Sequence, residues 1–363
     1  MNSQKRIRVV VGLSGGVDSS TAAALLVEQG HEVIGVTLKL WPHDCLSPEE
    51  DLFKCCGAKA AADARAVCER LGIPFHVLDE SAEFRRQVVH YFAAEYKAGR
   101  TPNPCILCNE RLKFGALLDR ARQFGAEFVA TGHYARLEKS ADGSRTLLKR
   151  GRDPRKDQSY VLFSLRQDQL ACAMFPLGEK TKSDTRAAAR HRNLKTADKE
   201  ESMEICFVPD NDYGKFLRQA KLVETHRGEI VSLHGEVLGH HDGIEFYTIG
   251  QRRGLGVSSS NPLYVVDLDV AGNRVIVGGG SALERDEFTV DRCNWILFDR
   301  PPAPIEVTVK IRYNHPGAPA TVSPLENGRA KVKLHAPQRA ITPGQAAVFY
   351  QDDWVVGGGW IAR

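Results

Sequence analysis

A run of glycines and serines near the start of the chain has the composition of a phosphate-binding loop. It extends from Gly12 to Ser20, between an apolar segment, Ile7 to Val11, and a segment with helical character, Thr21 to Gln29. Such an apolar segment is typical of a buried parallel strand, so the loop joins a strand to a helix. At this kind of junction, backbone N–H groups and the helix dipole face an anion. The pattern predicts that the loop holds the phosphates of ATP.

One acidic residue in the loop, Asp18, helps to indicate which reaction of ATP the loop serves. The loop lacks the Gly-Lys-Ser/Thr ending that kinases and GTPases use, so transfer of the γ-phosphate is not the natural inference. A carboxylate among phosphate-binding groups fits a Mg²⁺ ion that arrives with the nucleotide. Ser14, Ser19 and Ser20 add hydroxyl donors. The S-G-G-x-D-S pattern resembles the loop of enzymes that split ATP into AMP and pyrophosphate and so activate a carbonyl oxygen as its adenylate.

Two cysteines, Cys105 and Cys108, form a C-x-x-C motif that offers sulfur or metal chemistry. We expect the prolines of segment 101–104 to hold it extended, and a helix to begin near Glu110. Both thiols then share the electropositive start of that helix, which lowers the pKa of a thiol. Such a motif serves as a redox pair, as half of a zinc site or as ligands of an iron–sulfur cluster. The redox function is disfavoured because the surroundings are unlike a thioredoxin-like fold.

The chain has nine cysteines, and the others differ in their expected roles. Cys206 is a third candidate thiol for the same chemistry. Cys55 and Cys56 are adjacent, which suits a single tetrahedral zinc ion poorly. They could relay sulfur, bind metal or have a structural role, and the sequence leaves these alternatives open. We expect three further cysteines to pack as small apolar residues: Cys68, Cys172 and Cys293.

The elements that position these groups alternate between strand-like and helix-like over the first two hundred residues. The strand-like segments are 33–38, 75–78 and 128–131, and the helix-like segments are 58–71, 82–97, 110–124 and 183–192. This alternation predicts an α/β fold with a doubly wound parallel sheet. Ligands of such sheets bind beyond the carboxyl ends of the strands, so the Gly12–Ser20 loop and the turn Thr131–Tyr134 should line one crevice. Residues 135–148 read as a hairpin.

Length and composition bound the organisation of the chain. With 363 residues, we expect three domains: an α/β domain over 1–212, a small β domain over 213–282 and a β-barrel over 283–363. The chain is 42% hydrophobic and 26% charged, as globular proteins are. It has no apolar run of membrane-spanning length and no signal-peptide core, which predicts a cytoplasmic protein without a membrane partner. A net charge of +4 permits a nucleic-acid partner. The oligomeric state is not indicated.

Five motifs, in order along the chain, resemble those of the tRNA-specific 2-thiouridylases. They are Gly12 to Ser19, Gly132-His133-Tyr134-Ala135-Arg136, Lys156-Asp157-Gln158-Ser159-Tyr160, Ile205-Cys206-Phe207, and Tyr247 to Gly256. The resemblance implies a PP-loop ATP pyrophosphatase domain followed by two small β domains. It also implies the family's reaction, in which ATP adenylates the 2-oxygen of the wobble uridine in tRNAs for Lys, Glu and Gln, and sulfur displaces AMP. The implied partners are tRNA and a cysteine desulfurase or sulfur-relay protein as sulfur donor.

The resemblance also implies roles for individual residues. Cys108 is the implied nucleophile, and Cys206 is the partner that carries the persulfide. The implied ATP-binding residues are Gly12, Leu13, Ser14, Gly15, Gly16, Val17, Asp18, Ser19, Leu38 and Gly132. The implied tRNA contacts are Asn103, Pro104, Cys105, His133, Lys156, Asp157, Gln158, Arg312, Tyr313 and Gln345.

The chain departs from the familiar pattern of the family at Cys105. Many members have Asn-Pro-Asp where this chain has Asn-Pro-Cys. The change makes three thiols available, Cys105, Cys108 and Cys206. Related tRNA thiolases hold a [4Fe-4S] cluster by three cysteines, and our first hypothesis is that this chain does the same. The alternative is a cysteine persulfide with a transient Cys108–Cys206 disulfide and no cluster.

Two basic stretches flank the candidate thiols, as an RNA phosphate track requires. They contain Lys149, Arg150, Arg152, Arg155 and Lys156, then Arg186, Arg190, Arg192, Lys195 and Lys199. Three other functions remain open. They are an ATP-dependent amidating ligase with the same loop, a non-enzymatic RNA-binding protein, and a 4-thiouridine synthase. AMP release that depends on added tRNA distinguishes the first two from a tRNA thiolase.

Overall fold

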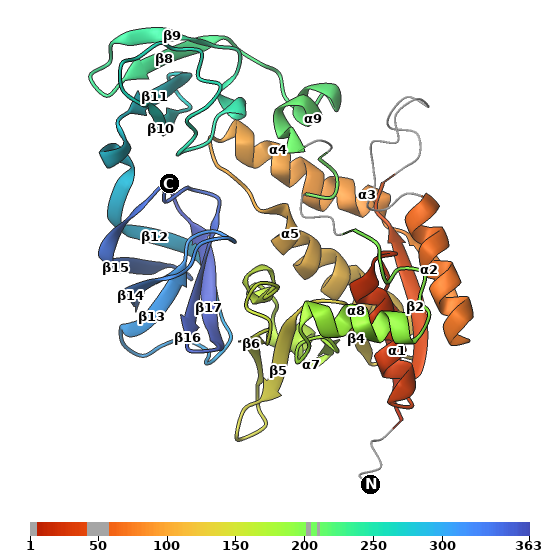
Figure 1. Cartoon of the computed structure of the whole chain (residues 1–363). Helices are drawn as coiled ribbons and strands as arrows, with labels where there is room; N and C mark the ends of the chain where they lie inside the picture. The colour runs from red at the N-terminus through yellow and green to blue at the C-terminus, as the bar shows by residue number, and fades with distance from the viewer. Residues whose placement is uncertain (1–5, 42–57, 201–204, 209–210) are drawn as a thin grey trace. The chain divides into compact units, whose positions relative to one another are not determined.

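The computed structural model describes residues 6–41, 58–200, 205–208 and 211–363 (Figure 1). The chain divides into two compact units. The first contains Met1–Val88, Cys105–Asn211 and Asp353–Val355, and the second contains Val89–Pro104, Asp212–Asp352 and Val356–Arg363. The boundaries of the three domains that we expect from the sequence are not tested by this division and stay a prediction.

A five-stranded parallel sheet forms the centre of the first unit. Its strands, in spatial order, are β3 (Phe75–Asp79), β2 (Glu32–Lys39), β1 (Arg8–Gly12), β4 (Phe128–Ala130) and β7 (Ala173–Met174). Val10 of β1 is paired with Ile34 on one side and Val129 on the other. The chain order reverses between β1 and β4, which is the topological switch point where ligands of such sheets bind. The predicted doubly wound parallel sheet is confirmed.

Helices cover this sheet because their apolar residues face its strands. The core includes Val9 and Val11 of β1, Ala23 and Leu26 of α1 (Val17–Glu28), and Cys68 of α2 (Ala58–Leu71). Cys68 is fully buried, as expected from the sequence, and burial raises the pKa of its thiol to about 12. This cysteine is therefore a packing residue and remains a protonated thiol at neutral pH.

The helix that carries the C-x-x-C motif begins earlier than the sequence predicts. It comprises α5 (Pro104–Leu107), a π-helical segment η2 (Cys108–Ala116) and α6 (Leu117–Gln123). A start near Glu110, with segment 101–104 wholly extended, is therefore wrong. Proline is favoured in the first turn of a helix because its missing N–H has no acceptor there. Pro104 accordingly starts the helix, and both cysteines lie in its first turns.

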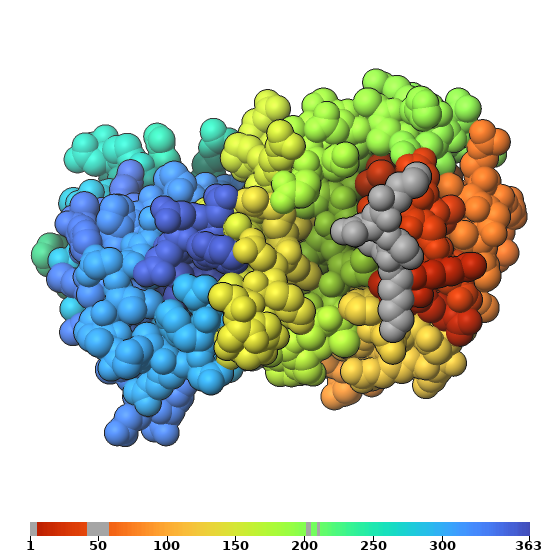
Figure 2. Space-filling model, turned by 90° about the horizontal axis from the view of Figure 1, so that it is seen from below, coloured from red at the N-terminus to blue at the C-terminus, as the bar shows by residue number. Residues whose placement is uncertain are grey.

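The remaining elements of the first unit are short. They are α3 (Ser81–Phe84), β5 (Ala135–Lys139), β6 (Thr146–Arg150), η3 (Ser159–Leu162), α7 (Gln167–Ala171) and α8 (Lys182–His191); η1 (Arg85–Val89) crosses into the second unit. Strands β5 and β6 form the predicted hairpin, and its exposed tip belongs to the face shown in Figure 2. Thr181 caps α8 by accepting a hydrogen bond from the Asp184 backbone N–H.

The second unit contains two β structures and two helices. A four-stranded sheet has the order β10 (Tyr264–Asp269), β11 (Arg274–Gly278), β8 (Gly228–Ser232) and β9 (Val237–His241). A barrel follows, with β12 (Glu284–Trp295), β15 (Ala330–Arg339), β14 (Ala318–Pro324), β13 (Ile305–Lys310), β16 (Ala346–Gln351) and β17 (Trp354–Ile361). It closes because β12 also pairs with β17, so the predicted C-terminal barrel is confirmed.

The helices of the second unit are α4 (His90–Lys97) and α9 (Tyr213–Gln219), with short turns η5 (Ile244–Phe246) and η6 (Gly280–Leu283). Tyr96 of α4 stacks on Tyr213 of α9, with ring centroids 4.4 Å apart. This contact joins α4 to a helix more than a hundred residues later. None of the helices in the described ranges has both the length and the apolar character that a membrane crossing requires.

Candidate nucleotide and sulfur sites

The phosphate loop has a backbone that only small residues can form. It leaves β1 at Gly12 and enters α1 at Val17. Gly15 has a φ of +69°, and a Cβ added there would lie 2.4 Å from the Ala60 carbonyl oxygen. A side chain at this position is excluded both by the left-handed backbone and by α2. Gly132, after β4, backs directly onto the loop, because its Cβ would lie 2.6 Å from the Ser19 nitrogen.

The three serines of the loop have different partners. Ser14 and Ser19 face each other, with their hydroxyl oxygens 3.3 Å apart, and the Ser14 N–H donates to the Ser19 hydroxyl. Ser20 is fully buried and donates to the Gly16 carbonyl over 2.8 Å. Ser14 is therefore the exposed hydroxyl of the loop, Ser19 is the buried hydroxyl that contacts it, and Ser20 stabilises the first turn of α1.

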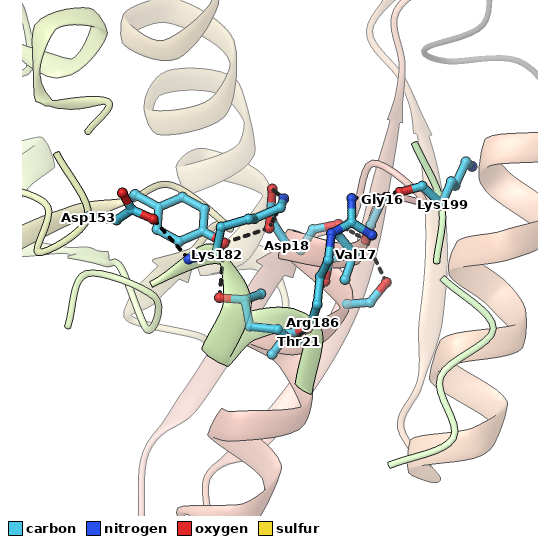
Figure 3. Close-up of polar contacts among 12 residues, drawn as sticks. Gly16, Val17, Asp18, Thr21, Asp153, Lys182, Arg186 and Lys199 are labelled. Carbon is cyan, nitrogen blue, oxygen red and sulfur yellow. Dashed lines mark hydrogen bonds and ion pairs between the residues drawn. The ribbon is translucent and has the colours of Figure 1, made fainter. Parts of the chain in front are cut away.

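Asp18 is the centre of a polar cluster at the start of α1 (Figure 3). Lys182, the first residue of α8, donates from its Nζ to both carboxylate oxygens of Asp18, over 2.7 and 2.8 Å. The hydroxyl of Tyr134 donates to the same carboxylate over 2.8 Å and lies 2.9 Å from the Thr185 hydroxyl. The sequence indicated Asp18 but not Lys182, which lies 164 positions later.

A second lysine holds the opposite side of the loop. The Nζ of Lys199 donates to the Gly15 carbonyl over 3.0 Å and forms an ion pair with Asp63. Arg186 of α8 reaches the same segment, since its guanidinium donates to the carbonyls of Ala197 and Lys199. Lys182 and Lys199 therefore bring two cationic side chains to the phosphate loop, and Arg186 binds the segment that carries Lys199.

The predicted segment Lys156–Gln158 supports this cluster from behind. Gln158 accepts a hydrogen bond from the Tyr134 N–H through its Oε1, and its own N–H donates to the Tyr134 carbonyl. Asp157 is buried and accepts from the N–H groups of Gly151 and Ser159. Gln158 therefore fixes the main chain of Tyr134, Asp157 fixes the main chain at Gly151 and Ser159, and Lys156 is half-buried.

Three apolar members of the predicted ATP set lie around the loop. Leu13 is buried, and its N–H donates to the Val36 carbonyl over 2.7 Å. Val17 is buried at the start of α1. Leu38 is half-buried near the carboxyl end of β2, where it pairs with Leu78. The loop and the ends of these strands thus belong to one edge of the sheet.

His133, a predicted tRNA contact, is buried beneath this edge. Its ring packs against Phe114 and Phe175, and its Nδ1 lies 2.7 Å from the Thr131 hydroxyl. Burial, with a smaller contribution from the Lys113 charge, holds the pKa of His133 well below its usual value. The side chain is therefore neutral near pH 7 and supplies no positive charge.

The two cysteines of the C-x-x-C motif differ in exposure. Cys105 is exposed, and Cys108, the first residue of η2, is buried. The π-helical segment is stabilised from outside, because the Gln169 amide donates to the carbonyls of Glu110 and Phe114 over 2.7 and 2.8 Å. Asn109, beside Cys108, donates to the Val161 carbonyl. These bonds fix the main chain around Cys108.

Cys206 is half-buried, and the residue after it is anchored. The ring of Phe207 meets the ring of Phe84 edge to face, with centroids 5.5 Å apart. Phe84 ends α3, which packs against η2, the segment that starts at Cys108. Cys206 and Cys108 thus belong to neighbouring parts of the first unit. The other predicted thiols in question, Cys55 and Cys56, lie outside the described residues.

The described parts of the chain contain no group of three or more histidine, cysteine, aspartate or glutamate side chains that could hold a metal ion. Cys105, Cys108 and Cys206, all within the described residues, therefore do not form the three-cysteine group that a cluster needs in this structure.

Family models and known proteins match nearly the whole chain. Three family models match in succession: the tRNA methyl transferase HUP domain over residues 7–210, the tRNA methyl transferase PRC-barrel domain over 214–279 and the aminomethyltransferase beta-barrel domain over 285–361. The tRNA-specific 2-thiouridylase MnmA of Geotalea uraniireducens is 49% identical over 99% of this chain and 96% of that protein. The protein of the same name from Moorella thermoacetica is 51% identical over 97% of this chain and 98% of the relative. This chain belongs to the tRNA-specific 2-thiouridylase family.

A solved structure of a 4-thiouridine synthetase–RNA complex with bound ATP is a more distant likeness. It is 17% identical, with a TM-score of 0.35, over 59% of this chain and 50% of that one. This likeness is too weak to carry an inference.

The remaining tRNA contacts that the 2-thiouridylase family implies lie in the second unit. Asn103 is half-buried and Pro104 is buried. Arg312 and Tyr313 are exposed at the end of β13, and Arg312 donates to the Arg339 carbonyl. Gln345, in the turn before β16, donates from its side-chain amide to the Thr101 carbonyl over 2.9 Å. Arg312 and Tyr313 thus have the exposure that an RNA contact needs, whereas Gln345 has a partner within the protein.

Many of the basic residues proposed as an RNA track form ion pairs within the first unit. Arg190 pairs with Asp198, and Arg192 pairs with Glu28. Arg186 and Lys199 bind the segment near the phosphate loop, as described above. Arg152, Arg155 and Lys195 are exposed and remain the better candidates for phosphate contacts.

Proposed function

We propose that this member of the 2-thiouridylase family replaces the 2-oxygen of the wobble uridine of tRNA with sulfur, using ATP. The observation that carries the proposal is the intact phosphate loop at the β1–β4 switch point of a chain 49% identical to a 2-thiouridylase over nearly its whole length. Ser14, Asp18 and Ser19 are all at the loop. From the family resemblance, we take the acceptors to be tRNAs for Lys, Glu and Gln.

The first step is adenylation of the 2-oxygen. Backbone N–H groups of the loop and the hydroxyls of Ser14 and Ser19 bind the phosphates of ATP. Asp18, the one carboxylate of the loop, would hold a Mg²⁺ ion that arrives with the nucleotide, and that ion would supply charge neutralisation at the phosphates. The uridine 2-oxygen attacks the α-phosphorus, and pyrophosphate leaves. The product carries AMP on the former carbonyl oxygen, which turns a poor leaving group into a good one.

For the sulfur step we propose the persulfide route and derive no step through a cluster, because the three cysteines are not arranged for one. Cys206 carries a sulfane sulfur as a persulfide. The terminal sulfur attacks C2 of the adenylated uridine, and AMP leaves with the former 2-oxygen. The Cys108 thiolate then attacks the Cys206 sulfur, a disulfide forms between the two cysteines, and the displaced electron pair stays on the sulfur bound to C2. A dithiol reductant then restores both thiols.

The sulfane sulfur comes from a donor protein of the cysteine desulfurase or sulfur-relay class. The exposed Cys105 is then an auxiliary thiol. Its exposure, three residues before Cys108, suits a role in accepting sulfur from the donor protein.

The test combines chemistry and metal content. The protein is purified anaerobically as wild type, Cys105→Ala, Cys108→Ser and Cys206→Ser, with Cys172→Ala as a matched control in the same unit. We expect 2-thiouridine in tRNA, measured by mass spectrometry, from the wild type and the control, and none from the Cys108 and Cys206 variants. AMP release should depend on added tRNA.

Two results would contradict parts of this proposal. About four iron and four sulfide per chain, lost in Cys105→Ala together with thiolation, would replace the persulfide route by a cluster. AMP release without tRNA, and no 2-thiouridine from any preparation, would remove tRNA thiolation itself and favour an amidating ligase.

A further inference from the structure

Lys182 neutralises the one acidic side chain of the phosphate loop. Its Nζ donates to both Asp18 oxygens over 2.7 and 2.8 Å, and its side chain is only 11% exposed. The Asp18 side chain is 33% exposed, so the pair is in contact with solvent and within reach of a ligand. The lysine of such a pair can leave the aspartate and bind an anion that arrives at the phosphate loop.

The backbone of Lys182 is held so that its side chain points at the loop (Figure 3). The N–H of Lys182 donates to the Asp153 carboxylate over 3.1 Å. Thr181, just before it, caps α8, and α8 packs against α1. The Nζ of Lys182 also lies over the ring of Tyr134, 5.8 Å from the ring centroid. The main chain that presents the ammonium group to the loop is therefore held by the Asp153 bond, by the cap at Thr181 and by the packing of α8 on α1.

Mg²⁺ binding changes the balance of charge at Asp18. A divalent cation and the Lys182 ammonium would compete for the same carboxylate oxygens and repel each other. The nucleotide brings several phosphate oxygens to the same place. Lysine is a compact cation on a flexible stem, well suited to exchange one anionic partner for another. The favourable arrangement is Mg²⁺ on Asp18 and Lys182 on a phosphate.

We propose that Lys182 is a phosphate-binding residue of the ATP site, held by Asp18 until the nucleotide arrives and then transferred to its phosphates. The inference deepens the proposed function and rests on its use of ATP. Lys182 contacts the phosphate chain beyond the α-position, where negative charge develops on the departing pyrophosphate. The other interpretation is a purely structural ion pair between α8 and α1.

The first test compares nucleotides with different phosphate chains. Dissociation constants of ATP, pyrophosphate and AMP are measured with Mg²⁺ for the wild type, Lys182→Ala and Lys182→Arg. Lys180→Ala, an exposed lysine two residues earlier, is the matched control. We expect Lys182→Ala to weaken ATP and pyrophosphate binding at least tenfold and AMP binding less than threefold. Lys182→Arg should retain part of the affinity, and Lys180→Ala all of it.

The second test separates contact with phosphate from simple neutralisation of Asp18. The same constants are measured without Mg²⁺ in an Asp18→Asn background, where the lysine has no carboxylate to neutralise. If Lys182 binds phosphate, adding Lys182→Ala to this background still weakens pyrophosphate binding at least fivefold. If it only neutralises Asp18, the added change has no effect, and the proposal fails.

The outcomes also separate this inference from the proposed function. An equal loss of ATP and AMP affinity in Lys182→Ala, with a lowered melting temperature, would show a structural ion pair and overturn the inference while leaving thiolation intact as a proposal. A wild type that binds ATP through Lys182 but never thiolates tRNA would overturn the proposed function instead. A wild type that binds neither ATP nor pyrophosphate would overturn both.

Discussion

The side-chain amide of Gln345 donates a hydrogen bond to the backbone carbonyl of Thr101 over 2.9 Å, and this bond ties the barrel to the segment that precedes Cys105. The contact is one of several. The Thr101 N–H donates to the Pro343 carbonyl over 2.8 Å. Between these residues Gly344 has a φ of +87°, and a Cβ there would lie 3.0 Å from the Thr101 nitrogen. The turn of residues 342–345 therefore fits closely over Thr101.

We expect Gln345→Ala to slow thiolation while leaving tRNA affinity unchanged. Loss of the amide donor removes one hydrogen bond from the Thr101 carbonyl, worth about 0.5–1.5 kcal/mol, which corresponds to about a two- to tenfold effect on rate. The measurement is the thiolation rate at saturating tRNA, together with the dissociation constant of tRNA. Gln351→Ala is the control, since Gln351 donates to the Glu306 carbonyl within the barrel over 3.0 Å. A raised dissociation constant with an unchanged rate would instead assign Gln345 to direct RNA contact.

Gly132→Ala should weaken nucleotide binding without unfolding the chain. The added Cβ would lie 2.6 Å from the Ser19 nitrogen and 2.7 Å from the Asp18 carbonyl carbon, so the first turn of α1 must move away from β4. The expected result is at least a tenfold rise in the dissociation constant of ATP, measured by calorimetry. Gly279→Ala is the control, because a Cβ at Gly279 meets nothing within 4 Å. ATP binding equal to wild type in Gly132→Ala would mean that the loop tolerates the shift.

The sequence was sufficient to predict the sheet and the phosphate loop, because both depend on local patterns. The strand that ends at Gly12 contains three consecutive buried valines, Val9 to Val11, and the turn after it is rich in glycine. Lys182 could not be found this way. It joins Asp18 through the packing of α8 on α1, and a lysine at the start of a helix has no local pattern that marks it as a site residue.

The thiol segment was harder to predict for two reasons. Proline is common both in extended loops and in the first turn of a helix. Pro104 lies in the first turn of a helix here. The π-helical segment from Cys108 shifts the spacing of apolar residues by one, and it depends on a residue from another helix, Gln169. Sequence spacing identified the cysteines, but not that one is exposed and the other buried.

The buried His133 should make stability depend on pH. The pKa of this side chain is held well below its ordinary value in the folded state, chiefly by burial. Below about pH 6.5 the unfolded chain binds a proton there that the folded chain does not, so the free energy of unfolding falls as the pH is lowered. The loss is at most about 1.4 kcal/mol per pH unit for one group.

The check on His133 is urea unfolding between pH 7.5 and 5.5. His133→Gln should reduce the slope of the free energy of unfolding against pH. A slope should remain, because burial also lowers the pKa values of His241 and His315. His226→Gln, at an exposed position, should leave the slope unchanged. Equal slopes for wild type and His133→Gln would indicate that His133 becomes protonated in the folded chain as readily as in the unfolded one.

Gln169→Ala should impair the sulfur step more than nucleotide binding. Gln169 is almost fully buried, and its amide is bonded to the carbonyls of Glu110 and Phe114, so its removal leaves two acceptors of the π-helical segment with one donor fewer each. Such a loss costs about 1–3 kcal/mol. The segment then relaxes toward an ordinary α-helix, which rotates Cys108 away from its position. We expect thiolation to fall at least tenfold, with the dissociation constant of ATP within threefold of wild type.

Gln167→Ala, in the same helix but bonded to Thr146, is the matched control. Parallel losses of ATP affinity and thiolation in Gln169→Ala would show that the bond supports the whole unit rather than the segment around Cys108.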